Sequence, residues 1–156
     1  MQEQKTNSSS TGKRNNTRLA AVKALYAAQI NEKIDSKKSP TQLTIDIVEF
    51  YFETEGKNKN LDQEFLIELI QGVFKNTEEL DNAIRSKLNE GWKLERLGPV
   101  ILSVLRTAIF EIMNCNDTHL NVIINEYVTI TRSFFDEKEV GFVNGVLDKI
   151  GHEVRS

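Results

Sequence analysis

The sequence predicts an all-α fold of about seven helices, and three observations support this prediction. Apolar residues recur at helical spacing in seven successive segments. Only two prolines and eight glycines interrupt the 156 residues, which favours long helices over many short strands. No segment shows a clear strand pattern of alternating apolar and polar residues.

The N-terminal part divides into a polar arm and two helices. Residues 1–12 are rich in Ser, Thr, Asn and Gln and have no apolar periodicity, so we expect a disordered arm there. The pattern that follows predicts a helix over residues 18–30, with Thr17 as its N-cap. Pro40 lies near the start of a second predicted helix. The apolar stripe of that second helix consists of Leu43, Ile47, Phe50 and Tyr51.

The GKNKN segment separates the second helix from a third, strongly periodic one. The apolar stripe of the third helix consists of Phe65, Leu66, Leu69, Ile70, Val73 and Phe74. Gly72 within this stripe indicates close approach of a neighbouring helix. Asn76 and Glu79 have the spacing of a capping box, which predicts the start of a fourth helix through Leu88.

Three more helices follow the GWKLERLGP connection, beneath which we expect Trp92 and Leu97 to fill the core. Pro99 suits the first turn of the fifth helix. The predicted buried face of this helix consists of Val100, Val104, Leu105, Ala108, Ile109 and Ile112. The apolar residues of the sixth helix are Val122, Ile123, Tyr127, Ile130 and Phe134. Asp136 and Glu139 form a second candidate capping box, which predicts a seventh helix through Ile150.

Composition indicates a compact cytoplasmic protein. An apolar fraction of 39% over 156 residues is enough for one domain with a core. The lone Cys115 excludes an internal disulfide and fits a reducing compartment. The polar N-terminus lacks the apolar segment of a secretory signal, and no apolar run approaches the ~20 residues that cross a bilayer. We therefore expect cytoplasmic localisation and no membrane contact.

The sequence holds no motif that indicates an enzyme, a metal site or a cofactor. His119 and His152 each lack the i, i+4 partner of a helical zinc site, and no glycine-rich nucleotide-binding motif is present. Cys115 near His119 leaves a nucleophile and base as an alternative, although accidental spacing explains the pair more simply. Arg106, Glu111 and Glu126 lie near apolar stripes, which predicts an internal ion-pair or hydrogen-bond network rather than catalytic groups.

Charge is distributed unevenly along the chain, although the net charge is only −3. Residues 1–38 carry eight Lys and Arg against three Asp and Glu, whereas residues 39–156 carry twelve against twenty. Lys13, Arg14 and Arg18 precede and enter the first predicted helix. Arginine-rich segments that fold against RNA are a recurrent recognition device, so this basic segment is a candidate RNA contact. A solvated tail without function is the alternative.

Five ordered blocks of the sequence resemble the bacterial transcription antitermination factors of the NusB family. The blocks are RLAAVKALYAAQ, LIQGVFKNTEELD, WKLERLGPVILSVLRTAIFEI, VIINEYVTITRSF and FVNGVLDKI, and the resemblance as a whole covers essentially all of residues 14–150. The resemblance implies two small packed helical bundles within a single NusB-like domain over residues 13–156. It also implies a non-enzymatic factor that pairs with the ribosomal protein NusE and binds boxA RNA of ribosomal RNA leaders. There it would support antitermination by RNA polymerase and ribosomal RNA synthesis. The resemblance leaves open whether the chain forms a homodimer.

The resemblance also assigns candidate RNA-binding residues. The arginine-rich motif of the family corresponds to KRNNTR, in which Lys13, Arg14 and Arg18 keep the basic character. Asn15 and Asn16 stand where the family often has further arginines. Since each lost phosphate contact reduces the salt dependence of binding, we expect weaker RNA affinity from the chain alone and greater reliance on the partner.

Tyr26 and Phe142 match aromatic positions that are linked to RNA contact in the family, although an amphipathic helix would bury both in any case. Ile101 replaces an acidic residue that some relatives carry. The thinned arginine motif leaves a second function open, that of a protein-interaction adaptor with little RNA affinity. NusB-like domains are also fused to RNA cytosine methyltransferases, but the absence of a nucleotide-binding motif argues against that activity.

Overall fold

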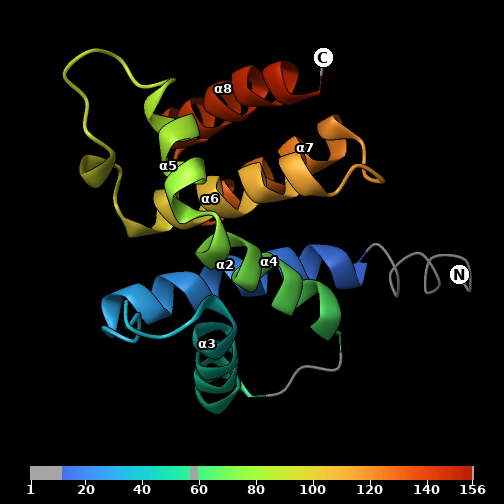
Figure 1. Ribbon diagram of the computed structural model, residues 1–156. Helices are drawn as coiled ribbons and strands as arrows, with labels where there is room; N and C mark the ends of the chain where they lie inside the picture. Colours follow the sequence, from blue (N-terminus) through green and yellow to red (C-terminus); the bar gives the residue numbers. More distant parts are fainter. Residues whose placement is uncertain (1–11, 57–59, 156) are drawn as a thin grey trace, which may run out of the picture. The chain divides into compact units, whose positions relative to one another are not determined.

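The computed structural model describes residues 12–56 and 60–155 and confirms the all-α prediction (Figure 1). These residues form seven α-helices, one short 3-10 helix and no strand. The chain divides into two compact units, residues 1–75 and residues 76–156. The arm predicted for residues 1–12 lies, apart from Gly12, outside the described residues.

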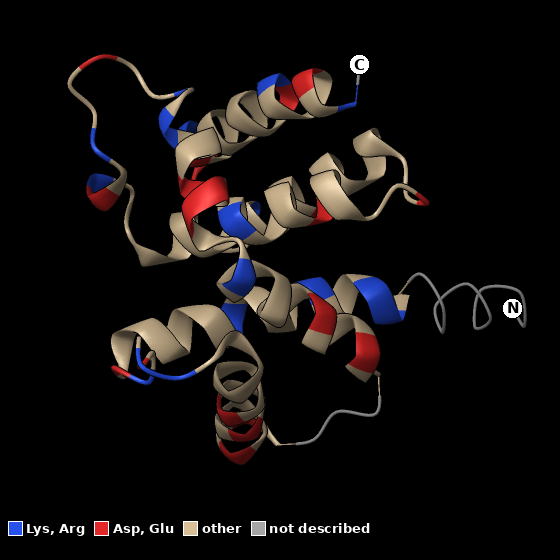
Figure 2. Cartoon of the chain, viewed as in Figure 1, with Lys and Arg blue, Asp and Glu red and all other residues tan. Residues whose placement is uncertain are grey.

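The first unit is a bundle of three helices, α2 (Lys13–Ile30), α3 (Pro40–Glu55) and α4 (Gln63–Lys75), each in contact with the other two. Small side chains on α2 allow neighbouring backbones to approach closely. The core residues of this unit include Ala21, Leu25, Ala28, Ile47, Leu66, Leu69 and Ile70. Basic residues lie on the first turns of α2, and acidic residues lie along α3 (Figure 2).

Thr17 does not cap the first helix, which begins five residues earlier than predicted, at Lys13. Its buried hydroxyl donates a hydrogen bond to the Lys13 carbonyl at 2.6 Å and accepts one from the Asp62 backbone N–H at 2.8 Å. The Asp62 carboxylate in turn accepts a hydrogen bond from the Phe65 N–H in the first turn of α4, at 3.1 Å. Thr17 therefore ties α2 to the start of α4, a role that spacing within α2 does not reveal.

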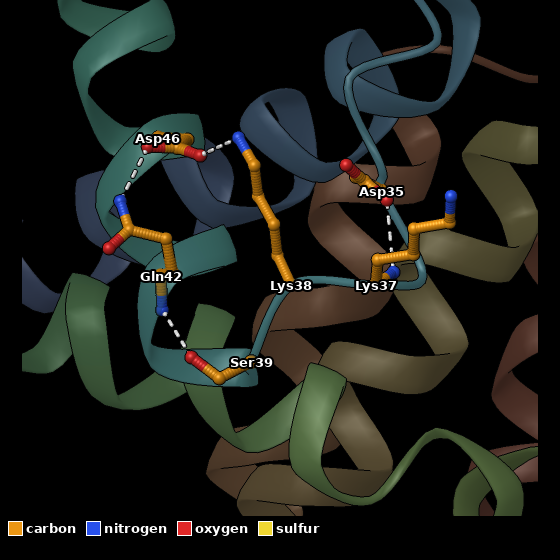
Figure 3. A network of polar contacts seen from close by, with 6 residues as sticks. All are labelled: Asp35, Lys37, Lys38, Ser39, Gln42 and Asp46. Carbon is orange, nitrogen blue, oxygen red and sulfur yellow. Dashed lines mark hydrogen bonds and ion pairs between the residues drawn. The ribbon is translucent and has the colours of Figure 1, made fainter.

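Ser39 caps the second helix, and Pro40 occupies its first position, as predicted. The Ser39 hydroxyl accepts a hydrogen bond from the Gln42 N–H at 3.1 Å (Figure 3). In the same network, the Lys38 ammonium and the Gln42 amide donate to the two oxygens of Asp46, at 2.6 and 2.9 Å. The hydrogen bonds from Lys38 and Gln42 lower the pKa of Asp46 below its ordinary value.

We expect the pKa of Asp46 to rise toward its ordinary value when Lys38→Ala removes the ammonium group. Because the folded-state pKa is depressed, this contact stabilises the fold above the unfolded-state pKa, and the contribution is lost as the pH falls through the folded value. A carboxyl-detected NMR titration measures the change. Lys37→Ala is the matched control, since Lys37 contacts Asp35 through its backbone N–H. Equal titration midpoints in the two variants would contradict the assigned cause.

The second unit contains α5 (Thr77–Arg85), the 3-10 helix η2 (Leu94–Leu97), α6 (Pro99–Asn114), α7 (Leu120–Arg132) and α8 (Glu137–Val154). Helix α6 is central, because it contacts α5, η2, α7 and α8. The predicted buried face of α6 is confirmed except at Val100, which is half-buried. The largest fully buried side chains of this unit are Leu80, Ile84, Leu105, Ile109, Ile112, Ile123, Tyr127 and Leu147.

The C-terminal ends of two helices in the second unit differ from the predictions. Helix α5 ends at Arg85, so Leu88 lies beyond it, and Phe134 lies beyond α7 and is exposed. Asn76 and Asp136 occupy the N-cap positions of α5 and α8, so the two predicted helix starts are confirmed, but neither side chain forms the capping hydrogen bond that the spacing predicted. Acidic residues in the first turns of α5 and α8 complement the helix dipole there instead.

Trp92 is not the core residue that the sequence predicted, since 56% of its surface is exposed. Leu94, two residues later in η2, is buried in its place, and η2 contacts α5 and α6. Leu97, the other predicted core residue, is half-buried. One leucine therefore anchors this connection, and the indole ring stays at the surface.

For Arg106 and Glu111 the predicted internal polar network is confirmed, with partners that spacing alone did not indicate. The Arg106 guanidinium donates two hydrogen bonds to Asp81 of α5, at 2.7 and 3.0 Å. Glu111 is fully buried and accepts a hydrogen bond from the Tyr127 hydroxyl of α7 at 2.8 Å. Glu126 is half-buried. These polar contacts connect α6 to both α5 and α7.

Arg155 closes the C-terminal end of α6. Its guanidinium donates hydrogen bonds to the carbonyls of Ile112, Cys115 and Thr118, at 2.9, 2.8 and 2.5 Å. The last carbonyls of an α-helix have no partner within the helix and carry a partial negative charge, so a cation is favoured there. One side chain thus holds the end of α6 and the turn that leads to α7.

Candidate nucleic-acid interface

The three predicted basic residues all lie within α2 and not on an arm that precedes it. Lys13, Arg14 and Arg18 occupy its first two turns, and Lys13 and Arg14 are half-buried. Figure 2 shows this concentration of Lys and Arg at the start of the helix. Since the segment is already helical, no ordering of its backbone is needed before it meets a ligand.

Phe65 of α4 underlies both arginines. The Cζ atoms of Arg14 and Arg18 lie 4.3 and 5.5 Å from the centre of its ring, which is the geometry of a cation–π contact. Arg18 also donates a hydrogen bond to the Asn15 side chain at 2.7 Å. Only 2% of Arg18 is exposed, so a direct contact with RNA would require its guanidinium to leave Phe65.

Tyr26 lies further along α2 and is half-buried. Twelve residues separate it from Arg14, which corresponds to roughly 18 Å along a helix that rises 1.5 Å per residue. The helix therefore fixes the spacing between the basic segment and this aromatic ring.

Phe142, the remaining predicted RNA contact, belongs to the second unit. It is half-buried on α8 and lines a surface hollow of about 510 Å³. Trp92, Arg96, Ile101 and Lys149 line the same hollow. Ile101 gives the hollow an apolar wall.

Several residues around these sites were missed by sequence reasoning. Phe65 was predicted only as part of an apolar stripe, and nothing local indicated that two arginines would lie on it. Trp92 was assigned to the core, although Lys93, Glu95 and Arg96 follow it closely and indicate a solvent-exposed connection. That density of charge was the available signal.

The described residues hold no cluster of side chains typical of metal binding. Within residues 12–56 and 60–155, no group of three or more His, Cys, Asp or Glu side chains could hold a metal ion. Cys115 is buried, whereas His119 is exposed at the N-cap of α7. None of the described helices is long and apolar enough to span a membrane.

Comparison with known proteins connects this geometry to one family. The model of the NusB family matches residues 15–152. The chain belongs to the NusB family. The transcription antitermination protein NusB of Caulobacter vibrioides is 38% identical over 142 residues, which cover 88% of this chain and 91% of that protein. The NusB protein of Bacillus cereus (strain B4264) is 38% identical over 138 residues, covering 88% and 96% of the two chains.

A solved NusB structure agrees with the fold. T. maritima NusB matches with a TM-score of 0.75 and 31% sequence identity, covering 92% of this chain and 93% of that one. The resemblance inferred from five sequence blocks is therefore confirmed at the level of family and of all-α fold. The chain is accordingly a member of a family of transcription antitermination proteins.

Proposed function

We propose that the chain is an RNA-binding antitermination factor that pairs with NusE and binds boxA RNA of ribosomal RNA leaders. The observation that supports this most directly is the basic start of α2, where Lys13 and Arg14 lie on a preformed helix. Phosphate contacts dominate the affinity of proteins for nucleic acids, and they need cations at fixed positions. The proposal places the protein in the cytoplasm, within an antitermination complex of RNA polymerase.

The residues have three roles in this proposal. Lys13 and Arg14 contact phosphates, and Tyr26 and Phe142 offer aromatic faces to bases. Arg18 acts indirectly, because it is buried and its guanidinium lies over the same Phe65 ring as that of Arg14. With two half-buried cations and a buried third, the chain alone binds weakly, and NusE completes the RNA-binding surface.

A gel shift with boxA and scrambled RNA, with and without NusE, tests the function. We expect a stronger shift with boxA than with the scrambled RNA, and a further increase when NusE is present. Equal shifts on both RNAs in the presence of NusE would contradict a role in boxA recognition.

We expect Arg14→Ala to weaken boxA binding about fivefold while helicity stays unchanged. The loss of one phosphate contact should reduce the slope of log K against log salt by about 0.7 for a single strand. Fluorescence anisotropy at several salt concentrations measures both quantities. Arg132→Ala is the matched control, because Arg132 is an exposed arginine in α7 of the second unit. An Arg14→Ala slope equal to that of the control would remove the start of α2 from the mechanism.

The burial of Arg18 favours one alternative, a protein-interaction adaptor of the same fold with little RNA affinity. In that case NusE copurifies with the chain, but neither the chain nor the complex shifts boxA RNA. The same gel shift therefore separates the two functions.

A further inference from the structure

Phe65 of α4 is a buried aromatic residue that lies against charged side chains. Only 2% of its surface is exposed. The Cζ atoms of Arg14 and Arg18 lie 4.3 and 5.5 Å from the centre of its ring, both within the roughly 6 Å over which a ring attracts a cation. Packing in the core does not require a cation at a phenylalanine ring. The two guanidinium groups therefore indicate that the ring does more than fill space.

A chain of hydrogen bonds fixes the residue that carries this ring. The Phe65 N–H donates to the Asp62 carboxylate at 3.1 Å, and the Asp62 N–H donates to the Thr17 hydroxyl at 2.8 Å. The Thr17 hydroxyl donates in turn to the Lys13 carbonyl at 2.6 Å, and Thr17 is fully buried. These bonds run from the first turns of α2 to the first turn of α4. The ring therefore has a defined position relative to the basic start of α2.

The two arginines differ in their access to a ligand. Arg14 is half-buried, whereas Arg18 is 2% exposed and donates to the Asn15 side chain at 2.7 Å. A guanidinium is planar and carries its N–H donors at its edges, so it can lie over an aromatic ring and still donate to a phosphate oxygen. Arg14 is therefore the arginine that can contact the ring and an RNA phosphate at the same time.

A ring in this place changes the cost of binding through Arg14. An arginine without support is ordered only when it binds a phosphate, and ordering one such side chain weakens binding roughly two- to tenfold. Contact with a fixed ring imposes part of that order before RNA arrives. The charge of the arginine is the same with or without the ring, so the salt dependence of binding does not change. Positioning and charge therefore have different experimental signatures.

We propose that Phe65 is a positioning residue for RNA binding, whose ring holds the Arg14 guanidinium in the orientation in which it donates to a phosphate. The inference rests on the proposed RNA-binding function and adds to it a residue of a second helix, α4, that does not itself touch RNA. The basic start of α2 is then one half of the device, and the first turn of α4 is the other.

A double-mutant cycle tests this role, with the complex with NusE and labelled boxA RNA in fluorescence anisotropy. Phe65→Leu removes the ring and keeps an apolar side chain in the core. We expect it to weaken binding about threefold and to leave the slope of log K against log salt unchanged. In the Arg14→Ala background, which already lacks the guanidinium, Phe65→Leu should weaken binding no further. Ile70→Val is the matched control, because it truncates a fully buried side chain of α4 that has no ring.

A second substitution changes the electrostatics of the ring and hardly changes its shape. Trifluorophenylalanine in place of Phe65 withdraws negative charge from the ring face, which weakens the attraction for a cation. We expect RNA binding to fall about twofold, whereas a residue that acted only through packing would leave it unchanged. Circular dichroism checks that each variant is folded. In the unbound protein, NMR should show that Phe65→Leu removes the ring-current shift of the Arg14 side-chain signals.

The outcomes separate this inference from the proposed function. Equal losses from Phe65→Leu with and without Arg14 would assign the effect to the fold, and this would overturn the positioning role and leave the function intact. Unchanged or tighter binding by Phe65→Leu would do the same, since the ring would then be irrelevant to RNA or would compete with it for the guanidinium. Failure of the unaltered complex to bind boxA RNA would overturn the proposed function itself.

Discussion

Asp81→Ala should lower the free energy of unfolding of the second unit by about 3 kcal/mol, because it leaves the Arg106 guanidinium without its carboxylate. Both side chains are largely withdrawn from water, with 11% of the Asp81 side chain and 21% of the Arg106 side chain exposed. Two hydrogen bonds join them, so the truncation removes a bidentate contact and not a single weak one. The partial exposure of Arg106 keeps the expected loss near the lower end for buried pairs.

Urea unfolding followed by circular dichroism measures this loss, and a double-mutant cycle with Arg106→Ala isolates the pair. We expect the double variant to be less destabilised than the sum of the two single variants, since removing both partners leaves no unpaired charge. Glu79→Ala is the matched control, because Glu79 is an exposed carboxylate of the same helix. Its loss should stay below about 1 kcal/mol, the size of a dipole contact. Additive single-variant losses would show that the pair is not coupled.

Arg155→Ala should destabilise the end of α6 by about 2 kcal/mol, because three backbone carbonyls lose a charged donor at once. The value stays below the sum of three charged hydrogen bonds, since water can reach part of this half-buried site. Arg155→Lys should recover less than half of the loss, because an ammonium group is a point charge without the planar fork of a guanidinium.

Hydrogen exchange detected by NMR locates the effect of Arg155→Ala. Amides in the last turn of α6 should exchange about thirtyfold faster, the equivalent of 2 kcal/mol, when local opening limits exchange. Arg132→Ala serves again as the matched control, since the Arg132 side chain is 53% exposed and its contact with Glu137 spans 3.6 Å. Uniform acceleration throughout the second unit would indicate that Arg155 stabilises the whole unit and not the end of α6.

Local patterns were sufficient to predict the helices but not their long-range polar contacts. The apolar stripe from Val104 to Ile112 predicted α6 correctly, because residues three or four positions apart lie on the same face of a helix and the pattern is visible within a short segment. Thr17 was misassigned as an N-cap because its partner, the Asp62 backbone N–H, lies 45 residues away in the sequence. The residues around Thr17 carry no information about that contact. Arg106 was predicted to need a partner, yet 25 residues separate it from Asp81, so spacing could not identify it.

In the candidate interface, too, the residues could be predicted from the sequence but their long-range contacts could not. Lys13, Arg14 and Arg18 were recognisable from composition and from family resemblance, since basic residues are visible in the sequence itself. The contact of Arg14 and Arg18 with Phe65 was not recognisable from the sequence, because it depends on how α2 packs against α4. Trp92 was misassigned because a connection without periodicity does not specify which of its apolar residues is buried, and Leu94 takes that place.

The position of Arg155 in the chain has a consequence for synthesis on the ribosome. The main contacts of α2, α3 and α4 are with one another, within the first 75 residues, so the first unit can fold while translation continues. The end of α6 gains its guanidinium only after translation has passed Arg155, roughly 80 codons later, which corresponds to about 4–16 s at bacterial rates of 5–20 residues per second. The basic start of α2 is therefore in place on the nascent chain seconds before the second unit is complete.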